Sequence, residues 1–183
     1  NGLGFDDARI VEVQAFDFPE LDLADAASIS RAIEQAAPSV IINAAAYTAV
    51  DKAESEPELA RAINALAPGI IGAAASRLGA RVIHYSTDYV YDGAKPSPYT
   101  EDDVPHPLCV YGATKAEGDA ALAASGAEHF IFRTSWVFGA HGNNFVKTML
   151  RLAAERDKLN IVADQFGAPT SAALLADVTA QVL

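Results

Sequence analysis

The most informative side chains in this sequence are a tyrosine and a lysine four positions apart, Tyr111 and Lys115, in the segment YGATKAEGDAALAAS. On a helix this spacing puts both side chains on one face, about one turn apart. An ammonium group beside a phenol stabilises the phenolate and lowers the pKa of the phenol, which is ordinarily about 10. Such a tyrosine can exchange a proton with a carbonyl or alcohol oxygen near neutral pH, so the pair predicts acid–base chemistry on that kind of group.

The spacing alone does not identify the pair, because Tyr91 and Lys95 have the same separation. That second pair is interrupted by an Asp-Gly dipeptide and followed by Pro96, which predict a turn, so its side chains need not face each other. Tyr111 and Lys115 instead open an alanine-rich segment that predicts a helix. A plainer interpretation of Tyr111 and Lys115 taken alone, a solvated lysine beside a half-buried tyrosine, stays open at this point.

A second group of reactive side chains, Ser86, Thr87 and Asp88, follows directly on the apolar run that includes Val82 and Ile83. Two hydroxyls and a carboxylate at the end of a buried strand are unfavourable in a core unless they are paired. They are suited to a place where a small ligand is held. The segment therefore indicates a binding site at the end of a strand.

The elements that must position these groups alternate between apolar, β-branched runs and alanine-rich stretches. The predicted strands are 9–16, 39–43, 81–87, 129–135 and 159–163, and the predicted helices are about 25–37, 55–78, 111–125, 144–156 and 172–183. Strands that alternate with helices of this length predict an α/β fold with a parallel sheet. Ligands in such folds bind outside the carboxyl ends of the strands. The residues expected at that edge are Asp17, Asn43 to Ala46, Ser86 to Asp88 and Thr134 to Trp136.

Composition limits the class of protein. The 183 residues are 51% hydrophobic and carry a net charge of −11, which disfavours a general affinity for nucleic acid or anionic membranes. No apolar run reaches the roughly 20 residues of a membrane span. A single cysteine, Cys109, agrees with a reducing cytosol, so a cytoplasmic protein without nucleic-acid or membrane partners is expected. The four histidines show no metal-ligand spacing, and we predict no catalytic metal; they are His84, His106, His129 and His141.

The three features together, Tyr111-x-x-x-Lys115, the hydroxyl of Thr87 and Asn-Ala-Ala-Ala after a strand, resemble the extended, sugar-nucleotide branch of the short-chain dehydrogenase/reductase superfamily. Longer strings resemble the dTDP-4-dehydrorhamnose reductase family from about residue 15 to 180, namely NAAAYTAVDKAESEP, HYSTDYVYDG, VYGATKAEGD, FRTSWVFGAHGNNFVKTML and DQFGAPTSAALLAD. The resemblance implies a Rossmann-like, doubly wound parallel sheet. It also implies that NADH or NADPH reduces the 4-keto group of dTDP-4-dehydro-6-deoxy-L-mannose to give dTDP-L-rhamnose.

The resemblance also implies roles for matching residues. Tyr111 is the implied proton donor, Lys115 its activator and a ligand of the nicotinamide ribose, and Thr87 a hydrogen-bond partner of the reacting oxygen. The implied cofactor contacts are Asp17, Asp22, Leu23, Ala44, Ala45, Ala46, Tyr47, Thr48, Tyr85, Tyr111 and Lys115. The implied substrate contacts are Thr87, Asp88, Trp136, Asn143 and Asn144.

The family pattern begins with a strand and a Gly-rich turn that holds the pyrophosphate, and NGLGFDD is not that turn, so both are expected to be missing from this chain. Residues 1–141 are then expected to form the dinucleotide-binding domain. Residues 142–183 are expected to begin an interleaved and truncated substrate-binding region. Asp17 beside the adenosine ribose favours NADH, because the 2′-phosphate of NADPH would meet its charge. A homodimer is compatible with the sequence.

Two alternatives stay open. Another extended sugar-nucleotide reductase or epimerase would share these motifs, although Tyr89 stands where the resembling 4,6-dehydratases have a glutamate, which disfavours elimination. The second alternative is a non-catalytic subunit, like the regulatory subunit of methionine adenosyltransferase, which also resembles this family. The presence of Thr87, Tyr111 and Lys115 together favours catalysis.

Overall fold

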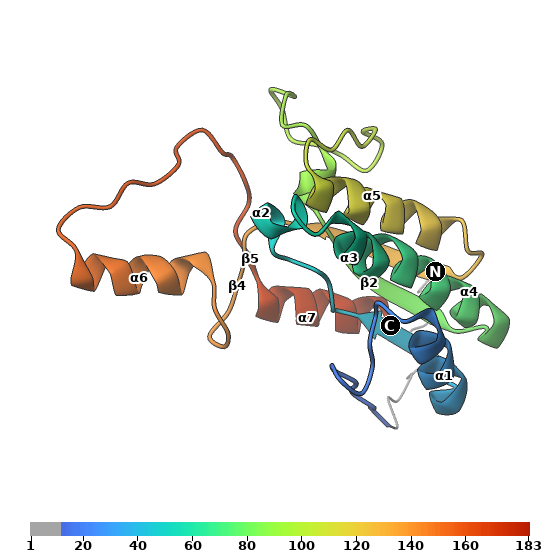
Figure 1. The fold of residues 1–183 in the computed structure, drawn as a ribbon. Helices are drawn as coiled ribbons and strands as arrows, with labels where there is room; N and C mark the ends of the chain where they lie inside the picture. Colours follow the sequence, from blue (N-terminus) through green and yellow to red (C-terminus); the bar gives the residue numbers. More distant parts are fainter. Residues whose placement is uncertain (1–11) are drawn as a thin grey trace, which may run out of the picture.

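The computed structural model describes residues 12–183, and its centre is a parallel sheet of three strands in the order β1-β2-β3 (Figure 1). Its strands are β1 (Val40–Asn43), β2 (Arg81–Thr87) and β3 (Glu128–Thr134). Asn43 pairs with His84, and Thr87 pairs with Thr134, so the carboxyl ends of the strands meet at one edge. The central strand β2 is buried along most of its length because strands flank both of its edges.

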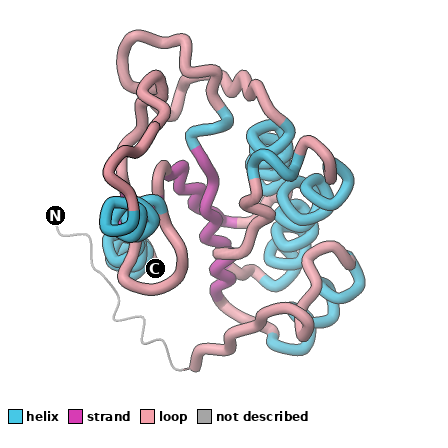
Figure 2. The backbone as a smooth tube through the Cα atoms, turned by 60° about the vertical axis from the view of Figure 1, so that its left-hand side comes forward, coloured by secondary structure: helices cyan, strands magenta, loops and turns pink. Residues whose placement is uncertain are grey.

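Helices cover both faces of this sheet (Figure 2). Val82 of β2 packs in a cluster with α4 (Ala67–Leu78) and α5 (Val110–Ala123). Tyr85, three residues further along β2, donates or accepts a hydrogen bond of 2.6 Å with Thr179 of α7 (Ala172–Val182). Since side chains an odd number of residues apart point to opposite faces of a strand, α7 lies on the face opposite α4 and α5.

One long helical segment runs from Pro57 to Leu78 and contains α3 (Pro57–Arg61), a π-helical turn η1 (Ala62–Leu66) and α4. The π-turn has a local cause: Pro68 has no N–H, and its ring would clash with the carbonyl of Asn64 in a regular α-helix. By length and composition this segment could cross a membrane, but half of its most apolar window is buried inside the fold. The segment is therefore packed like the core helix of a globular domain.

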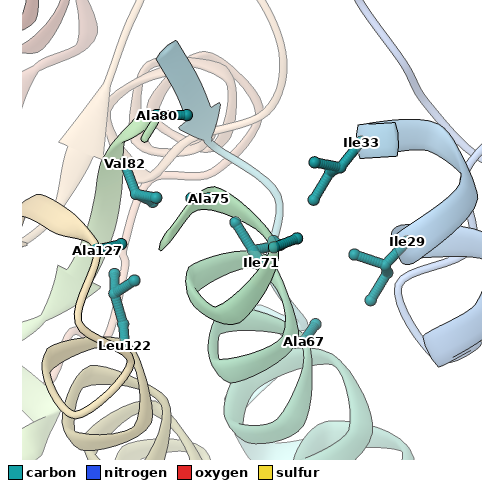
Figure 3. Close-up of a cluster of buried hydrophobic side chains, with 10 residues drawn as sticks. Ile29, Ile33, Ala67, Ile71, Ala75, Ala80, Val82, Leu122 and Ala127 are labelled. Atoms are coloured by element: carbon teal, nitrogen blue, oxygen red, sulfur yellow. The ribbon is translucent and has the colours of Figure 1, made fainter. Parts of the chain in front are cut away.

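The hydrophobic core lies between α1 (Ala26–Ala36), α4, β2 and α5 (Figure 3). Ile29 and Ile33 of α1 face Ile71 of α4, and Leu122 of α5 completes the cluster. The contribution of α4 is otherwise mainly alanine, and the small side chains let α1 and α5 approach its backbone closely. This packing fixes α5, the helix that carries Tyr111 and Lys115.

The remaining elements are short or peripheral. They are α2 (Val50–Ala53), the 3₁₀ turn η2 (Asp88–Val90), β4 (Val137–Phe138), α6 (Phe145–Glu155) and β5 (Thr170–Ser171). Strand β4 pairs with β5 in a separate two-stranded sheet. Helix α6 stands away from the rest of the fold in Figure 1 and contains no buried residue.

The predicted α/β fold, its five helices and three of its strands are confirmed, with helix boundaries within two residues. The predicted strand 159–163 is wrong, and so is the described part, 12–16, of the predicted strand 9–16. Residues 12–16 and 159–163 are irregular, since neither segment pairs with a described strand, and Ile161 and Val162 are more than half exposed. Residues 9–11 and the segment NGLGFDD lie outside the described residues. The boundary at residues 141 and 142 stays a prediction.

Candidate active site

Tyr111 lies in the first turn of α5, where Cys109 is the N-cap residue. Gly112 lets this turn press against η2, because a Cβ at Gly112 would stand 2.1 Å from the carbonyl oxygen of Tyr89. The ring of Tyr111 packs edge-on against the ring of Tyr89, with 5.6 Å between the centroids. Close helix packing thus brings the phenol to the carboxyl end of β2, beside Thr87.

The electrostatic surroundings keep the Tyr111 phenol protonated. Burial raises the pKa of Tyr111 and the negative charge of Asp88 raises it further, whereas hydrogen bonding to Thr87 lowers it. The lowering of this pKa by Lys115, expected from the sequence, is absent in this structure because the ammonium group is directed elsewhere. The phenol therefore keeps its proton at neutral pH.

Lys115 is 1% exposed, and its Nζ donates to the carbonyl oxygen of Tyr85 at 2.7 Å. The same Nζ lies 3.1 Å from Nε2 of His84. Burial lowers the pKa of Lys115 to about 8, although the nearby carboxylate of Asp119 acts in the opposite direction. The side chain therefore carries its charge through most of the neutral range, one turn of α5 away from Tyr111.

Thr87 is the last residue of β2 and is held by its neighbours. Its hydroxyl donates to the Asp88 carboxylate at 3.3 Å and accepts from the backbone N–H of Tyr89 at 3.2 Å, which caps η2. These bonds fix the hydroxyl beside the phenol of Tyr111. The structure brings three predicted site residues together here, namely Thr87, Asp88 and Tyr111.

The loop after β1 presents small side chains on a fixed backbone. Ala44, Ala45 and Thr48 are exposed, while Ala46 and Tyr47 are partly buried. Asn64 accepts from the N–H of Tyr47 at 2.9 Å and donates to its carbonyl oxygen at 3.0 Å. The backbone at Ala44, Ala45 and Ala46 carries only methyl side chains, so a ligand can approach it closely. The Tyr47 hydroxyl donates to Glu56 at 2.7 Å and anchors the far end of the loop.

Four other predicted cofactor residues have local structural contacts. Asp17 is exposed and accepts from the N–H of Phe18, and Asp22 accepts from the N–H of Ala24. Leu23 packs against the hydrophobic core. Tyr85 directs its hydroxyl to Thr179 of α7 on the opposite face of the sheet from Lys115. Their contacts with a cofactor stay predictions.

The predicted substrate residues beyond β3 gather around α6. Trp136 is 39% exposed, has a left-handed backbone (φ 49°) and packs edge-on against Phe145 with 5.2 Å between centroids. Asn144 caps α6 by accepting from the N–H of Lys147, and Asn143 is exposed. Trp136 thus offers a partly open aromatic surface, and Asn144 has a structural role that the sequence did not indicate.

A family-wide comparison matches residues 6–183 to the RmlD substrate binding domain. The chain belongs to this family. Among curated relatives, the dTDP-4-dehydrorhamnose reductase of Escherichia coli K12 is 54% identical over 162 residues, which are 88% of this chain and 54% of the relative. The enzyme of the same name from Burkholderia thailandensis is 52% identical over 164 residues, 90% of this chain and 55% of the relative. The chain spans about half the length of the curated relatives it matches.

Solved structures of RmlD-type proteins have the same fold. A dTDP-4-dehydrorhamnose reductase from Clostridium acetobutylicum superposes with a TM-score of 0.91 at 43% identity, covering 96% of this chain and 62% of that one. The corresponding protein from Bacillus anthracis, solved in complex with NADP, gives a TM-score of 0.87 at 41% identity, covering 91% and 59%. The Rossmann-like fold class expected from the resemblance is confirmed.

Sequence reasoning missed several residues that build the site in this RmlD family member. Asn64 in the π-turn donates to Thr114 of α5 at 3.3 Å, in addition to holding Tyr47. Gly118 allows this contact, since a Cβ there would stand 2.0 Å from the carbonyl oxygen of Asn64. Glycines at 112 and 118 inside a helical pattern were the available signal. Within residues 12–183 no three His, Cys, Asp or Glu side chains could hold a metal ion.

Proposed function

We propose that this chain carries the catalytic core of a dTDP-4-dehydrorhamnose reductase. The reaction is reduction of the 4-keto group of dTDP-4-dehydro-6-deoxy-L-mannose to dTDP-L-rhamnose, with NADH or NADPH as the reductant. The observation that carries the proposal is the protonated, half-buried phenol of Tyr111 beside Thr87 at the end of β2. The names of the relatives at 52–54% identity support this substrate.

The bound cofactor would supply a hydride to the keto carbon. Tyr111 transfers its proton to the keto oxygen as negative charge develops there, and Thr87 donates a hydrogen bond to the same oxygen. The bond from Thr87 to Asp88 is long, at 3.3 Å, so a substrate oxygen can replace it. The phenolate that remains regains a proton from solvent, and Lys115 would bind the ribose of the nicotinamide.

The substrate is proposed to lie between Tyr111 and the group around α6. Asp88 would accept hydrogen bonds from sugar hydroxyls, and Trp136 would offer its ring to the apolar edge of a 6-deoxy sugar. Asn143 and Asn144 would lie near the nucleotide. The division into a dinucleotide-binding region at 1–141 and a substrate-binding region from 142 is part of the same proposal.

Replacing Tyr111 with phenylalanine tests the proton donor. In the intact protein, Tyr111→Phe is expected to lower kcat by at least about 100-fold, because positioned general acids contribute roughly that much. Binding of NADPH, followed by fluorescence titration, should stay within a few-fold of wild type. The matched control is Tyr91→Phe, which alters the other Tyr-x-x-x-Lys pair and should leave kcat nearly unchanged. Turnover of Tyr111→Phe close to wild type would refute the assignment.

Substrate choice is tested separately by assaying reduction of dTDP-, GDP- and UDP-linked 4-keto sugars. Clear selectivity for the dTDP sugar supports the proposal, and selectivity for another nucleotide identifies a different sugar-nucleotide reductase. An intact protein that binds the cofactor and reduces none of them would be a non-catalytic binding subunit instead.

Cofactor preference is proposed to depend on Asp17. Its exposed carboxylate has no ion pair with any residue in the described part of the chain, so it would repel a 2′-phosphate by on the order of 1 kcal/mol. Wild-type kcat/KM should favour NADH several-fold, and Asp17→Ala should erase or reverse that preference. Asp102→Ala, which removes an exposed carboxylate from a distant loop, is the control. Equal specificity constants in wild type would show that Asp17 does not face the ribose.

A further inference from the structure

A buried polar network lies behind Tyr111 and joins all three strands of the sheet to α5. Its members are Asn43 of β1, His84 and Ser86 of β2, Arg133 of β3, and Lys115 and Asp119 of α5. All except Arg133 are less than 9% exposed. Polar groups at this depth must satisfy one another, so their hydrogen-bonding states are coupled.

Lys115 makes two hydrogen bonds inside this network. Its ammonium group has three N–H donors, of which one is directed to the carbonyl oxygen of Tyr85 and one to Nε2 of His84. The carbonyl is a fixed backbone acceptor, whereas Nε2 accepts only in one of the two neutral forms of the imidazole. The state of His84 therefore decides whether the ammonium is held.

His84 is neutral, because burial and the charge of Lys115 lower its pKa to about 3. A neutral imidazole has one N–H and one lone pair. If Nε2 accepts from Lys115, Nδ1 must carry the hydrogen, and it then needs an acceptor. The Asn43 side-chain amide lies 3.1 Å from Nδ1, and a half-turn of that amide presents its oxygen in place of its nitrogen. Asn43 can thus select the form of His84 that accepts from Lys115.

We propose that His84, oriented by Asn43, is a positioning residue that holds the Lys115 ammonium group in place for its role beside Tyr111. The inference rests on the proposed function, since it acts through Lys115. The opposite arrangement requires a neutral lysine, with Nε2–H donating to Nζ and the Asn43 amide nitrogen donating to Nδ1. The two arrangements differ by one proton, so the protonation of Lys115 is coupled to the orientation of its neighbours.

The charged groups around this pair are few. Asp119 accepts from Ser86 at 2.8 Å and from Arg133 at 3.3 Å through Oδ2, while its Oδ1 is buried without a partner, 3.8 Å from Nε2 of His84. The other titratable groups that α5 carries beside Lys115 are Tyr111 and Glu117, and Glu117 is directed outward to Arg61 at 3.0 Å. Removal of the His84 acceptor would leave Asp119 Oδ1 as the competing partner for the ammonium group. His84 therefore keeps the Lys115 ammonium group from being drawn to Asp119.

The first experiment measures the tautomer of His84 directly and needs no turnover. In the intact protein labelled with ¹⁵N-histidine, long-range ¹H–¹⁵N correlation at pH 7 reports which ring nitrogen carries the hydrogen, with His84→Gln for assignment. We expect a hydrogen on Nδ1 and a bare Nε2. A hydrogen on Nε2 would overturn the proposal, whether or not the protein reduces a sugar nucleotide.

The second experiment compares His84→Leu, which removes the acceptor, with His84→Gln, which keeps one. The high-pH limit of kcat reports loss of the Lys115 charge; it should move up by about one pH unit in His84→Leu, because the ammonium group then pairs with the carboxylate of Asp119, and stay near wild type in His84→Gln. If His84→Leu has a lower Tm but the same high-pH limit of kcat as the wild type, His84 has only a structural role, and the proposal is overturned. If His84→Leu does not fold, the tautomer measurement decides. If the intact wild-type protein is inactive, this result counts against the proposed reaction, and the tautomer measurement still tests the role of His84.

Discussion

His84 illustrates at the scale of one residue how burial changes the acid–base behaviour of a side chain. Its ring is 1% exposed, and the neighbouring Lys115 adds to the effect of burial, so its pKa falls to about 3 from the ordinary 6.5. The unfolded chain therefore binds a proton at this position at a higher pH than the folded chain does. Stability must fall as the pH drops below about 6.5 and continue to fall until about pH 3.

This linkage predicts acid sensitivity that depends on His84. Between pH 7 and pH 5, the wild type should lose about 2 kcal/mol of unfolding free energy more than His84→Gln does, since the pH falls about 1.5 units below the unfolded pKa. Urea unfolding at the two pH values measures the difference. His141→Gln, which replaces an exposed histidine, should behave like wild type. Parallel losses in wild type and His84→Gln would show that His84 is not a buried neutral group.

At the scale of elements, the position of α5 depends on two glycines. Gly112 meets the carbonyl oxygen of Tyr89, and Gly118 meets that of Asn64, at distances where no Cβ can fit. Both contacts are with backbone atoms, so rotation of a side chain cannot relieve the overlap. The close backbone contacts at Gly112 and Gly118 therefore fix the position of α5, the helix that carries Tyr111 and Lys115.

Gly118→Ala should destabilise the intact protein by about 2 kcal/mol or more, although alanine is the better helix former by about 1 kcal/mol. The cause is overpacking against Asn64, and the loss should appear as a lower urea midpoint. Gly139→Ala is the control, because its new Cβ would meet only the Cβ of Ala172 at an ordinary 3.5 Å. A stabilised Gly118→Ala would mean that α5 does not approach the π-turn this closely.

These contacts also explain what the sequence could reveal about the site. The pairing of Tyr111 with Lys115 follows from helix spacing and the hydroxyl of Thr87 from the end of a strand, both of which are local patterns, whereas the joint role of Tyr111 and Thr87 was implied by the family resemblance. The direction of the Lys115 side chain depends on His84, 31 residues away, and on burial that no local pattern reports. The pKa of Tyr111 was expected to fall because of Lys115. It rises instead, because the phenol is buried and the ammonium group is directed to His84 and Tyr85.

At the scale of the whole molecule, errors in the predicted fold occur where an apolar run has no partner. Segments 81–87 and 159–163 both read as strands, yet only the first lies between other strands. The second continues from α6 as an exposed irregular stretch, with Phe166 95% exposed further along. Apolar composition predicts burial only when the rest of the fold supplies a surface to cover it, and that surface is a property of the tertiary structure.

The π-turn at Ala62–Leu66 makes the length of the helical segment as important as its composition. A π-turn holds one residue more than the α-helical turn it replaces, and here the N–H of Ala67 reaches back to the carbonyl of Ala62. A one-residue deletion in this turn would force it toward α-helical winding, in which the ring of Pro68 clashes with the carbonyl four residues before it. Relief of that clash would displace Asn64 from both Tyr47 and Thr114. The link between the two sides of the site is thus encoded partly by a residue count, which no substitution of a side chain can restore.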